Sequence, residues 1–505
     1  MSLRFLPFRL DRPTIIVGLG VILFGIIMTD WSLIKATVYD GYSADLGNMW
    51  QSVWNLGHGY GWVFTHPISG DQLPRLAIHA DYLLLGYLPW VFWDTGWKIM
   101  LATQAIGVSL AAWALYWLGR RIHGHATIAA MLAIAYLSAG SVQFPTLWQY
   151  HSVLLVPTFL LAMTEGMVAR RRPWMAWLWF GLALVSVEQV GLVAGPLMAW
   201  LWWHEGQRRR AWASLIIGWT WSWLHFGLII PFFRPDMLGP HLLLESYYPL
   251  ADAGSITAWS QILSPQWLTA RLWQSRHLVS SVLLLLPFGG LALAHPLILL
   301  AAIAILPFWL ADLPTAYTLM YQHHVLTLPI LALATCFGIQ FILQRLRPFR
   351  PWVSRWLAVW LMMCGFLATR SFSLFPWTRI DLTAWRLTDP DLPALAKQIQ
   401  KLPSTATVAH NPGMEPQARS FRVSWQMPRG AAQADYLIFY QPRLRIVARN
   451  TRTKRLADQS RELQAFVQVT AAWKRVASYR RGAIYQRQRP LTDREREEMI
   501  QAMGG

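Results

Sequence analysis

The sequence predicts an all-α polytopic membrane bundle of about eleven transmembrane helices, followed by a small C-terminal α/β domain. Three observations predict this fold: 55% of the residues are hydrophobic, only 14% are charged, and 31 of the 505 residues are tryptophan. Ordinary globular proteins have roughly 25% charged residues, and tryptophan is enriched at membrane–water interfaces. The two cysteines, Cys336 and Cys364, lie in apolar stretches and exclude a disulfide framework or a cysteine metal site.

A membrane helix needs about 20 apolar residues. Eleven segments are predicted to span the membrane: 13–34, 98–118, 126–144, 152–169, 174–187, 190–203, 212–233, 278–293, 296–311, 324–344 and 354–369. No small-residue cleavage site follows the first segment, so we expect a membrane helix there and not a removable signal peptide.

Positive charge predicts the orientation of these spans. Fifteen of the 44 basic residues precede the first span or fall in alternate connections and the adjoining span end, which places all of them on one predicted side. They are Arg4, Arg9, Arg12, Arg120, Arg121, Arg170, Arg171, Arg172, Arg208, Arg209, Arg210, Arg345, Arg347, Arg350 and Arg355. Cytoplasmic connections carry such an excess, so we expect a cytoplasmic N-terminus and an extracytoplasmic C-terminus.

This orientation defines two predicted domains. Residues 1–369 form the transmembrane domain, with external loops at 35–97 and 234–277, and residues 370–505 form the extracytoplasmic α/β domain. That domain carries 23 Lys or Arg and 11 Asp or Glu, a net charge of +12. We therefore expect it to favour anionic lipid headgroups or a polyanionic saccharide, and we expect no nucleic-acid partner.

Within the C-terminal domain, alternating apolar residues predict strands, and a Gly turn predicts a hairpin. The strands are expected at 406–409, 436–440 and 466–470, the hairpin joins 475–479 to 483–486, and a helix fits 393–400.

The apolar run 173–204 has Arg-rich flanks at both ends, so both ends should be cytoplasmic. It must then fold as a hairpin of two short helices with its tip near Glu188. A carboxylate just below the outer surface is a functional candidate because its burial in a membrane is costly. The structural alternative is a glutamate dissolved in water at the tip.

The first external loop contains a predicted helix over 44–56, which Ser43 can cap. Its apolar residues form one stripe with two tryptophans, so we expect the helix to lie flat in the outer membrane interface. Asp45 falls in its first turn, where a general base could reach a substrate anchored in lipid. The alternative is a helix-terminal charge of structural use only.

Two further polar clusters are candidate binding sites. One is Arg75, His79, Asp81 and Tyr82, which is weak as a metal site because His-x-Asp alone is a weak signal. The other is Tyr321-Gln322-His323-His324 at the expected outer entrance to a span, which fits a pocket mouth or an interfacial belt equally.

The loop motif resembles a known family. Asp45-Leu46-Gly47 with Gln51, Trp54, Asn55 and Gly59 is similar to the DLGxxxQxxWNxxxG signature of domain of unknown function 2079, a family of polytopic membrane proteins. Weaker similarity continues at His79, at Glu188 with Gly191, and at Tyr321 to His324 with Pro329. Strand motifs at 402–408 and 434–438 extend it, although the final acidic residue of the last motif is absent here.

This family resembles GT-C class glycosyltransferases in architecture. The resemblance implies transfer of a sugar from a polyprenyl-phosphate donor to a saccharide or lipid acceptor on the outer face of the plasma membrane. Asp45 matches the catalytic acid of that class, with Asp40 as the alternate and Glu188 orienting the acceptor. The predicted substrate-binding residues are Arg75, His79, Tyr321, Gln322, His323, His324, Gln51 and Trp54.

Two other classes of function remain open. A transporter or flippase usually has broken helices or polar residues at the membrane midplane, and a non-catalytic scaffold needs no carboxylate at position 45. The sequence does not decide whether a divalent metal is a cofactor, although Asp40 and Asp45 are possible ligands.

Overall fold

The computed structural model of the protein describes residues 11–37, 44–67, 69–169, 173–234, 264–311, 314–374, 391–411, 414, 420–427, 430–440, 461–479 and 482–502. The chain divides into two compact units. The helical unit comprises Met1–Asp30, Leu76–Leu83 and Ala102–Ile380. The mixed unit comprises Trp31–Arg75, Leu84–Leu101 and Asp381–Gly505, so the first predicted external loop contributes to both units.

Five helices in the described part of the chain are long and apolar enough to cross a membrane. They are α1 (Arg12–Thr37), α3 (Gly96–His123), α9 with its extension through η5 and α10 (Arg208–Phe233), α17 (Thr327–Arg345), and α18 with the preceding turn (Arg347–Ser371). A bent pair, α4 (Ala126–Ser138) and α5 (Gly140–Trp148), adds a sixth if its 44° bend interrupts one span. The protein is therefore a multi-pass membrane protein.

The other expected spans fall on shorter helices. They are η3 with α6 (Ser152–Val168), α7 (Pro173–Leu184), α8 (Gly191–His204), α14 with η7 (Ser275–Phe288) and α15 (Leu297–Trp309). At 1.5 Å per residue, these helices reach at most about 25 Å, less than the roughly 30 Å of a bilayer core. Length and composition thus support five or six of the eleven expected spans among the described residues.

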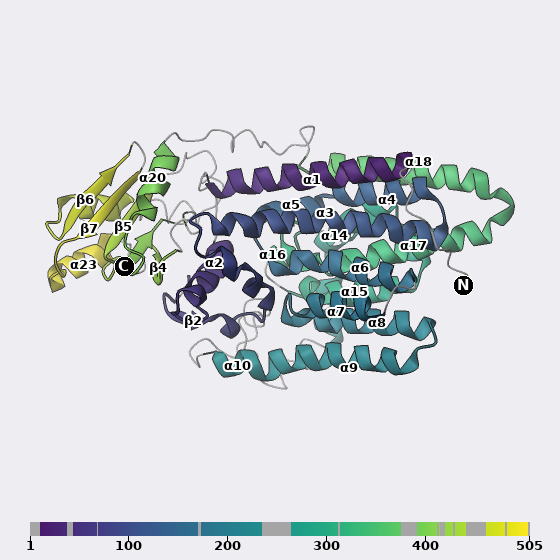
Figure 1. Ribbon diagram of the computed structural model, residues 1–505, viewed down its shortest axis with the longest axis horizontal. Coiled ribbons are helices and arrows are strands. Elements are labelled where there is room, and N and C mark those ends of the chain that lie inside the picture. The colour runs from purple at the N-terminus through teal and green to yellow at the C-terminus, as the bar shows by residue number, and fades with distance from the viewer. Residues whose placement is uncertain are drawn as a thin grey trace. The chain divides into compact units, whose positions relative to one another are not determined.

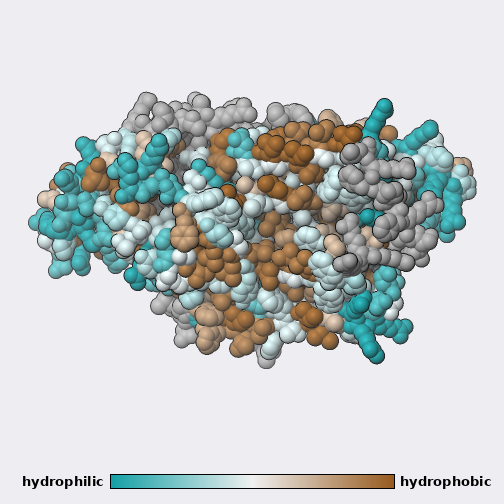
Figure 2. Space-filling view, in the orientation of Figure 1, coloured by the Kyte–Doolittle hydropathy of each residue, from teal (hydrophilic) through white to brown (hydrophobic). Residues whose placement is uncertain are grey.

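The described basic residues of the predicted cytoplasmic connections gather at one end of the helical unit. In Figure 1 this is the right-hand end, where α1 begins, α3 ends, and the connections α8–α9 and α17–α18 turn. Arg120 at the end of α3 lies 3.0 Å from the Asp11 carboxylate, which precedes α1. Figure 2 shows teal, hydrophilic side chains at that end and brown, hydrophobic side chains over the helices.

Helices α8 and α9 (Arg208–Leu224) run side by side (Figure 1) and touch through small residues. A Cβ atom added to Gly191 would lie 2.0 Å from the Gly218 carbonyl oxygen, and one added to Gly195 would lie 3.2 Å from the Ser214 carbonyl oxygen. Glycines four residues apart let membrane helices approach closely. The apolar run 173–204 thus folds as two short helices, as its Arg-rich flanks predict.

We expect Gly191→Ala to lower the stability of the protein by about 1–3 kcal/mol, because the new methyl group forces two backbones apart. Thermal unfolding of the purified protein in detergent measures this. The matched control is Gly181→Ala in α7, where nothing lies within 4 Å of the new methyl group. The control should match wild type or gain slightly from its higher helix propensity. A Gly191→Ala protein as stable as the control would contradict the close α8–α9 contact.

The mixed unit contains α2 (Ala44–Gly57), the helix predicted in the first external loop; Ser43, its expected cap, lies outside the described residues. The expectation that the apolar stripe of α2 faces lipid is wrong. Protein covers its apolar stripe, with Leu46 at 1% exposure and Trp50 and Val53 at 0%. The two-stranded sheet β1 (Val63–Thr65) and β2 (Gln72–Pro74) follows α2 in this unit.

Five strands among the described residues form a mixed sheet near the C-terminus, in the order β4-β3-β5-β7-β6. The strands are β3 (Thr407–His410), β4 (Val423–Gln426), β5 (Tyr436–Tyr440), β6 (Trp473–Ser478) and β7 (Gly482–Arg487). β3 pairs in parallel with β4 and β5, whereas β7 pairs antiparallel with β5 and β6. The predicted hairpin and the strands at 406–409 and 436–440 are confirmed, and β4 was not predicted.

Helices cover both faces of this sheet. α20 (Asp391–Gln400), the predicted helix, buries Leu395 against Ile438 on one face. On the other face, Leu463 and Val467 from a helix over 461–469 pack with Met499 of α23 (Asp493–Ala502). The strand predicted at 466–470 is therefore wrong. Its β-branched residues suggested a strand, but the i, i+4 spacing of Leu463 and Val467 is helical.

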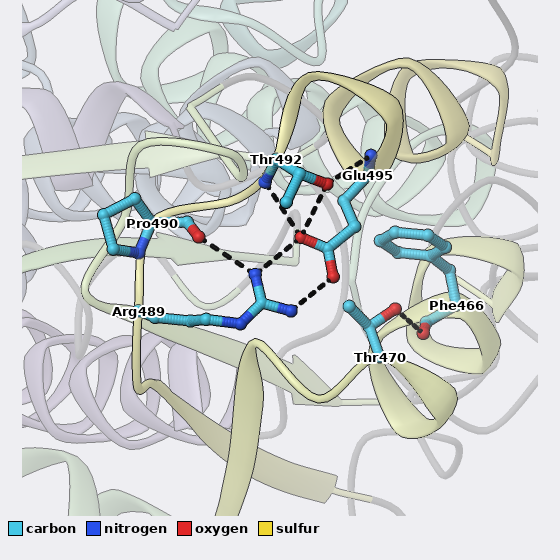
Figure 3. A network of polar contacts seen from close by, with 6 residues as sticks. All are labelled: Phe466, Thr470, Arg489, Pro490, Thr492 and Glu495. Carbon is cyan, nitrogen blue, oxygen red and sulfur yellow. Dashed lines mark hydrogen bonds and ion pairs between the residues drawn. The ribbon is translucent and has the colours of Figure 1, made fainter.

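α23 begins with a capping box, drawn in Figure 3. The Glu495 carboxylate accepts a hydrogen bond from the Thr492 N–H (2.9 Å), and the Thr492 hydroxyl accepts one from the Glu495 N–H (3.3 Å). Both carboxylate oxygens of Glu495 also bind the Arg489 guanidinium at 2.7 Å. These contacts satisfy N–H groups that a helix start leaves open, so α23 starts at a defined position beside the sheet.

Candidate functional site: a histidine held by a buried carboxylate

The helical unit joins His79 and Glu188, two residues 109 positions apart. His79 Nδ1 lies 2.9 Å from Glu188 Oε1, and the Ala80 N–H donates to Glu188 Oε2 at 3.0 Å. The Glu188 side chain is 0% exposed, whereas that of His79 is 28% exposed. A fully buried carboxylate therefore holds a histidine that remains accessible to solvent or ligand.

The break between α7 and α8 positions Glu188 at the start of η4 (Glu188–Val190). The Ser222 hydroxyl of α9 donates to the Glu188 carbonyl oxygen at 2.6 Å. That bond requires the close α8–α9 approach that Gly191 allows. The alternative of a glutamate dissolved in water at the hairpin tip is thus wrong, because the segment 76–83 covers Glu188.

The charge state of Glu188 follows from these contacts. Burial alone would raise the pKa of this carboxyl, because burial disfavours the charged form. The positive charge of His79 and the hydrogen bonds from His79 and Ala80 outweigh burial and hold the pKa well below its usual range. Glu188 is therefore ionised at neutral pH.

Tyr82 extends the polar cluster on the same segment. Its hydroxyl lies 3.0 Å from His225 Nε2, and its ring meets the Trp221 ring edge-on. Burial, together with the nearby charges of Asp81 and Glu188, raises the pKa of Tyr82. Tyr82 therefore stays protonated and can donate a hydrogen bond to the His225 ring.

Together these residues form what we call the His79–Glu188 site. An imidazole whose Nδ1 binds a carboxylate is held in one orientation. Its charged form, which also lowers the pKa of Glu188, can donate a proton or stabilise an anion. The arrangement can therefore serve proton transfer or the binding of a developing negative charge.

The Tyr321-to-His324 cluster lies at the break between α4 and α5. His324 Nε2 donates to the Ser141 carbonyl oxygen at 2.7 Å, next to the bend, and the Tyr321 ring meets Trp148 edge-on at 4.9 Å. His324 is 2% exposed. Tyr321, Gln322 and His323 are half-buried. His324 thus supports the broken helix, and its three neighbours remain partly accessible.

In the mixed unit, two residues of the loop motif bind the chain's own backbone. The Gln51 amide donates to the Thr65 hydroxyl and to the Phe421 carbonyl oxygen, both at 3.1 Å, and accepts from the Thr65 N–H at 2.9 Å. One turn later, Asn55 donates to the Val63 and Arg422 carbonyl oxygens. Gln51 is 0% exposed, so we assign it to fastening the segment before β4 and not to the substrate.

The other predicted residues of the mixed unit differ in exposure. Trp54 is 5% exposed and stacks on the His58 ring at 3.9 Å, and Arg75 is 3% exposed with its guanidinium over the Phe64 ring. Asp45 is half-buried in the first turn of α2. Asp40 lies outside the described residues. Of the motif side chains, Asp45 is the acid that the structure leaves partly accessible.

A metal centre was left open by the sequence. Within the part of the chain that the structure describes, no three His, Cys, Asp or Glu side chains come together in a group that could hold a metal ion.

Comparison with known proteins identifies the family. A family model described as a predicted membrane protein, domain of unknown function 2079 (DUF2079), matches residues 40–411. The chain belongs to this family. The resemblance seen in the motif around Asp45 is thereby confirmed, and the matched range includes His79, Glu188 and His324 of this DUF2079 protein.

Solved structures offer only distant likenesses. ArnT from Cupriavidus metallidurans bound to undecaprenyl phosphate superposes with a TM-score of 0.46 at 13% identity, covering 92% of this chain and 97% of ArnT. The oligosaccharyltransferase AglB from Archaeoglobus fulgidus, in complex with an inhibitory peptide and a dolichol phosphate, superposes with a TM-score of 0.36 at 12% identity. The match covers 83% of this chain and 69% of AglB. No curated protein matches this DUF2079 protein significantly.

We expect Glu188→Gln to destabilise the protein by about 3 kcal/mol at neutral pH, because removing one partner of a buried ion pair is costly. The low pKa of Glu188 sets the pH dependence. Its ionised form stabilises the fold above 4.5, the ordinary value for this group, and this stabilisation is lost as pH falls toward the lower folded value. The stability gap between wild type and variant should therefore narrow below pH 4.5.

Thermal unfolding across this pH range measures the gap, with Glu205→Gln as control, since Glu205 is exposed. A gap that stays constant down to low pH would show that the ion pair does not cause the loss.

We expect Gln51→Ala to loosen the segment 420–424, because the Thr65 N–H and the Phe421 carbonyl oxygen lose their partner. An unsatisfied buried polar group costs about 1–3 kcal/mol. Hydrogen exchange of the peptide covering 420–424 should accelerate roughly tenfold or more. Gln400→Ala on the exposed side of α20 is the control. Unchanged exchange at 420–424 would refute the fastening role.

Proposed function

We propose that this protein is a membrane glycosyltransferase. It would move a sugar from a polyprenyl-phosphate donor to a saccharide or lipid acceptor on the outer face of the plasma membrane, with inversion and with Asp45 as general base. The proposal assumes the predicted topology, which has eleven spans, a cytoplasmic N-terminus and an extracytoplasmic C-terminus.

One observation carries the proposal. The acidic residues and histidines singled out above lie in connections at the end of the membrane helices opposite the arginine-rich end. α1 starts at the basic end, so the connection that contains Asp45 and His79 leaves α1 at its other end. α8 and α17 both run toward the basic end, so Glu188 and His324, which precede them, lie opposite it. Because basic connections are cytoplasmic, these groups face the outer side.

The chemistry assigned to Asp45 is proton removal. The acceptor hydroxyl loses its proton to the Asp45 carboxylate while its oxygen attacks the anomeric carbon. The bond from that carbon to the phosphate oxygen breaks, and the lipid phosphate leaves with the electron pair. Attack from the opposite face inverts the anomeric centre. Asp45 suits this role because it is half-buried in the first turn of α2.

His79 is assigned to the departing phosphate, whose charge an imidazolium can stabilise. Glu188 then acts as a positioning residue, because its carboxylate touches His79 and is itself inaccessible. This modifies the role expected for Glu188 from sequence, which was to orient the acceptor. Tyr321, Gln322 and His323 are the partly accessible groups assigned to substrate binding.

Transport of a lipid-linked substrate is a second candidate, and the break between α4 and α5 favours it. Broken helices with polar partners for their freed carbonyls form the binding sites of many transporters. Here Gln143 donates to the Leu137 carbonyl oxygen at 3.0 Å, and His324 binds Ser141. Transport predicts substrate movement across the membrane without release of free lipid phosphate.

We expect Asp45→Asn to reduce sugar transfer at least roughly 100-fold, the usual contribution of a general base. The assay follows release of labelled sugar from a polyprenyl-phosphate panel by purified protein in lipid. Asp71→Asn, an exposed acid in the same connection, is the control and should stay within about twofold of wild type. Equal turnover by Asp45→Asn and wild type would exclude Asp45 as the base. No turnover with any donor, together with labelled lipid moving between leaflets, would favour transport.

A further inference from the structure

A group of side chains where α14 (Ser275–Leu285) begins and α15 ends has buried polar atoms that no protein group satisfies. His277 is 1% exposed, and neither Nδ1 nor Nε2 has a hydrogen-bond partner. The Nε1 of Trp309 and the Nε of Arg276 are likewise buried without a partner. In native proteins such groups are almost always hydrogen-bonded, so four unpaired atoms on three side chains point to a partner from outside the chain.

Ring contacts join these side chains into one cluster. Trp309 stacks on the His277 imidazole with centroids 5.6 Å apart, and Tyr317 meets the same imidazole edge-on at 5.7 Å. The Arg276 guanidinium lies 4.1 Å from the Tyr317 ring centre. The Ser280 hydroxyl donates to the Tyr317 carbonyl oxygen at 3.2 Å and fixes Tyr317 to α14.

The chemistry of the unpaired atoms selects an anion. Indole and guanidinium groups only donate hydrogen bonds, and imidazole donates from one or both nitrogens. The positive end of the α14 dipole adds to the Arg276 charge, and Gln274 at its N-cap makes no side-chain capping bond. An anion with several acceptor oxygens, such as phosphate, matches this donor set.

The surroundings select a lipid as the carrier of that phosphate. Leu278, Val279 and Val282 of α14 are 67%, 57% and 53% exposed, so an apolar face continues from the cluster along the helix. The cluster also lies at the non-basic end of the helical unit, since Phe308 contacts His323 just before α17. A headgroup at the cluster could therefore place its chains beside α14.

We propose that Arg276, His277 and Trp309 bind the phosphate group of a membrane lipid whose chain lies along the exposed face of α14. The phosphate belongs either to a polyprenyl phosphate or to a bulk phospholipid. The first source rests on the proposed glycosyl transfer, whereas the phosphate site itself does not.

The test is lipid binding by the delipidated full-length protein in a phosphate-free detergent, followed by native mass spectrometry. The two probes are undecaprenyl phosphate and phosphatidylglycerol, titrated separately. Arg276→Gln should weaken binding roughly tenfold or more, because a charge-assisted hydrogen bond is lost. Trp309→Phe keeps an aromatic ring beside His277 but removes the indole N–H, so binding should weaken by a few fold. Arg347→Gln, at the basic end and exposed, is the charge-matched control.

The two probes distinguish the sources. Selective weakening of undecaprenyl phosphate binding identifies a polyprenyl phosphate, and equal weakening of both identifies a general phospholipid phosphate. Wild-type binding by both variants, or an equal loss in Arg347→Gln, overturns the proposal. If Arg276→Gln does not fold, lipid binding by Trp309→Phe tests the proposal. A protein that binds lipid through these residues and releases no sugar would keep this site and reject the proposed function.

Discussion

The buried charge of Glu188 is the constraint on which the helical unit depends. An ionised carboxylate without partners would be prohibitively costly inside a membrane protein, so both of its oxygens need donors. His79 and the Ala80 N–H supply them, which fixes the segment 76–83 onto the break between α7 and α8. The same break needs Ser222 on its carbonyl oxygen, and Ser222 reaches it only because Gly191 and Gly218 let α8 and α9 touch. The His79–Glu188 ion pair, the Ser222 hydrogen bond and the glycine contact between α8 and α9 thus depend on one another.

The mixed unit uses polar side chains in a different way. Gln51 and Asn55 lie one turn apart on α2 and bind backbone groups of 63–65 and 421–422. They fasten the first connection to the edge of a sheet formed some 370 residues later. The loop motif therefore combines two tasks: its amides fix the fold, and Asp45 remains the partly accessible acid.

The two ends of the helical unit differ in chemistry. The basic end carries arginines that pair within the protein, as Arg120 does with Asp11 and Arg121 with Glu165. The opposite end carries histidines in three distinct settings: His79 on a carboxylate, His324 on a freed carbonyl oxygen, and His277 among aromatic rings. Only the last setting leaves both ring nitrogens of a described histidine unsatisfied, which is why we assign it a ligand from outside the chain.

The sequence by itself determined that the protein is a multi-pass membrane protein and that its basic connections lie at one end of the helices. It also determined the helix around Asp45 and most of the C-terminal strands, because hydrophobic periodicity and charge are local signals. It also placed Glu188 at a break between two short helices. It failed where a local pattern has two solutions: residues 466–470 have strand-like composition but 466–469 belong to a helix, and the apolar stripe of α2 faces protein instead of lipid. Only the tertiary structure decided which carboxylate holds His79, what Gln51 binds, and that His277 is buried beside Trp309. These pairings join residues far apart in the chain, and side-chain spacing along a sequence carries no information about contacts that the fold alone creates.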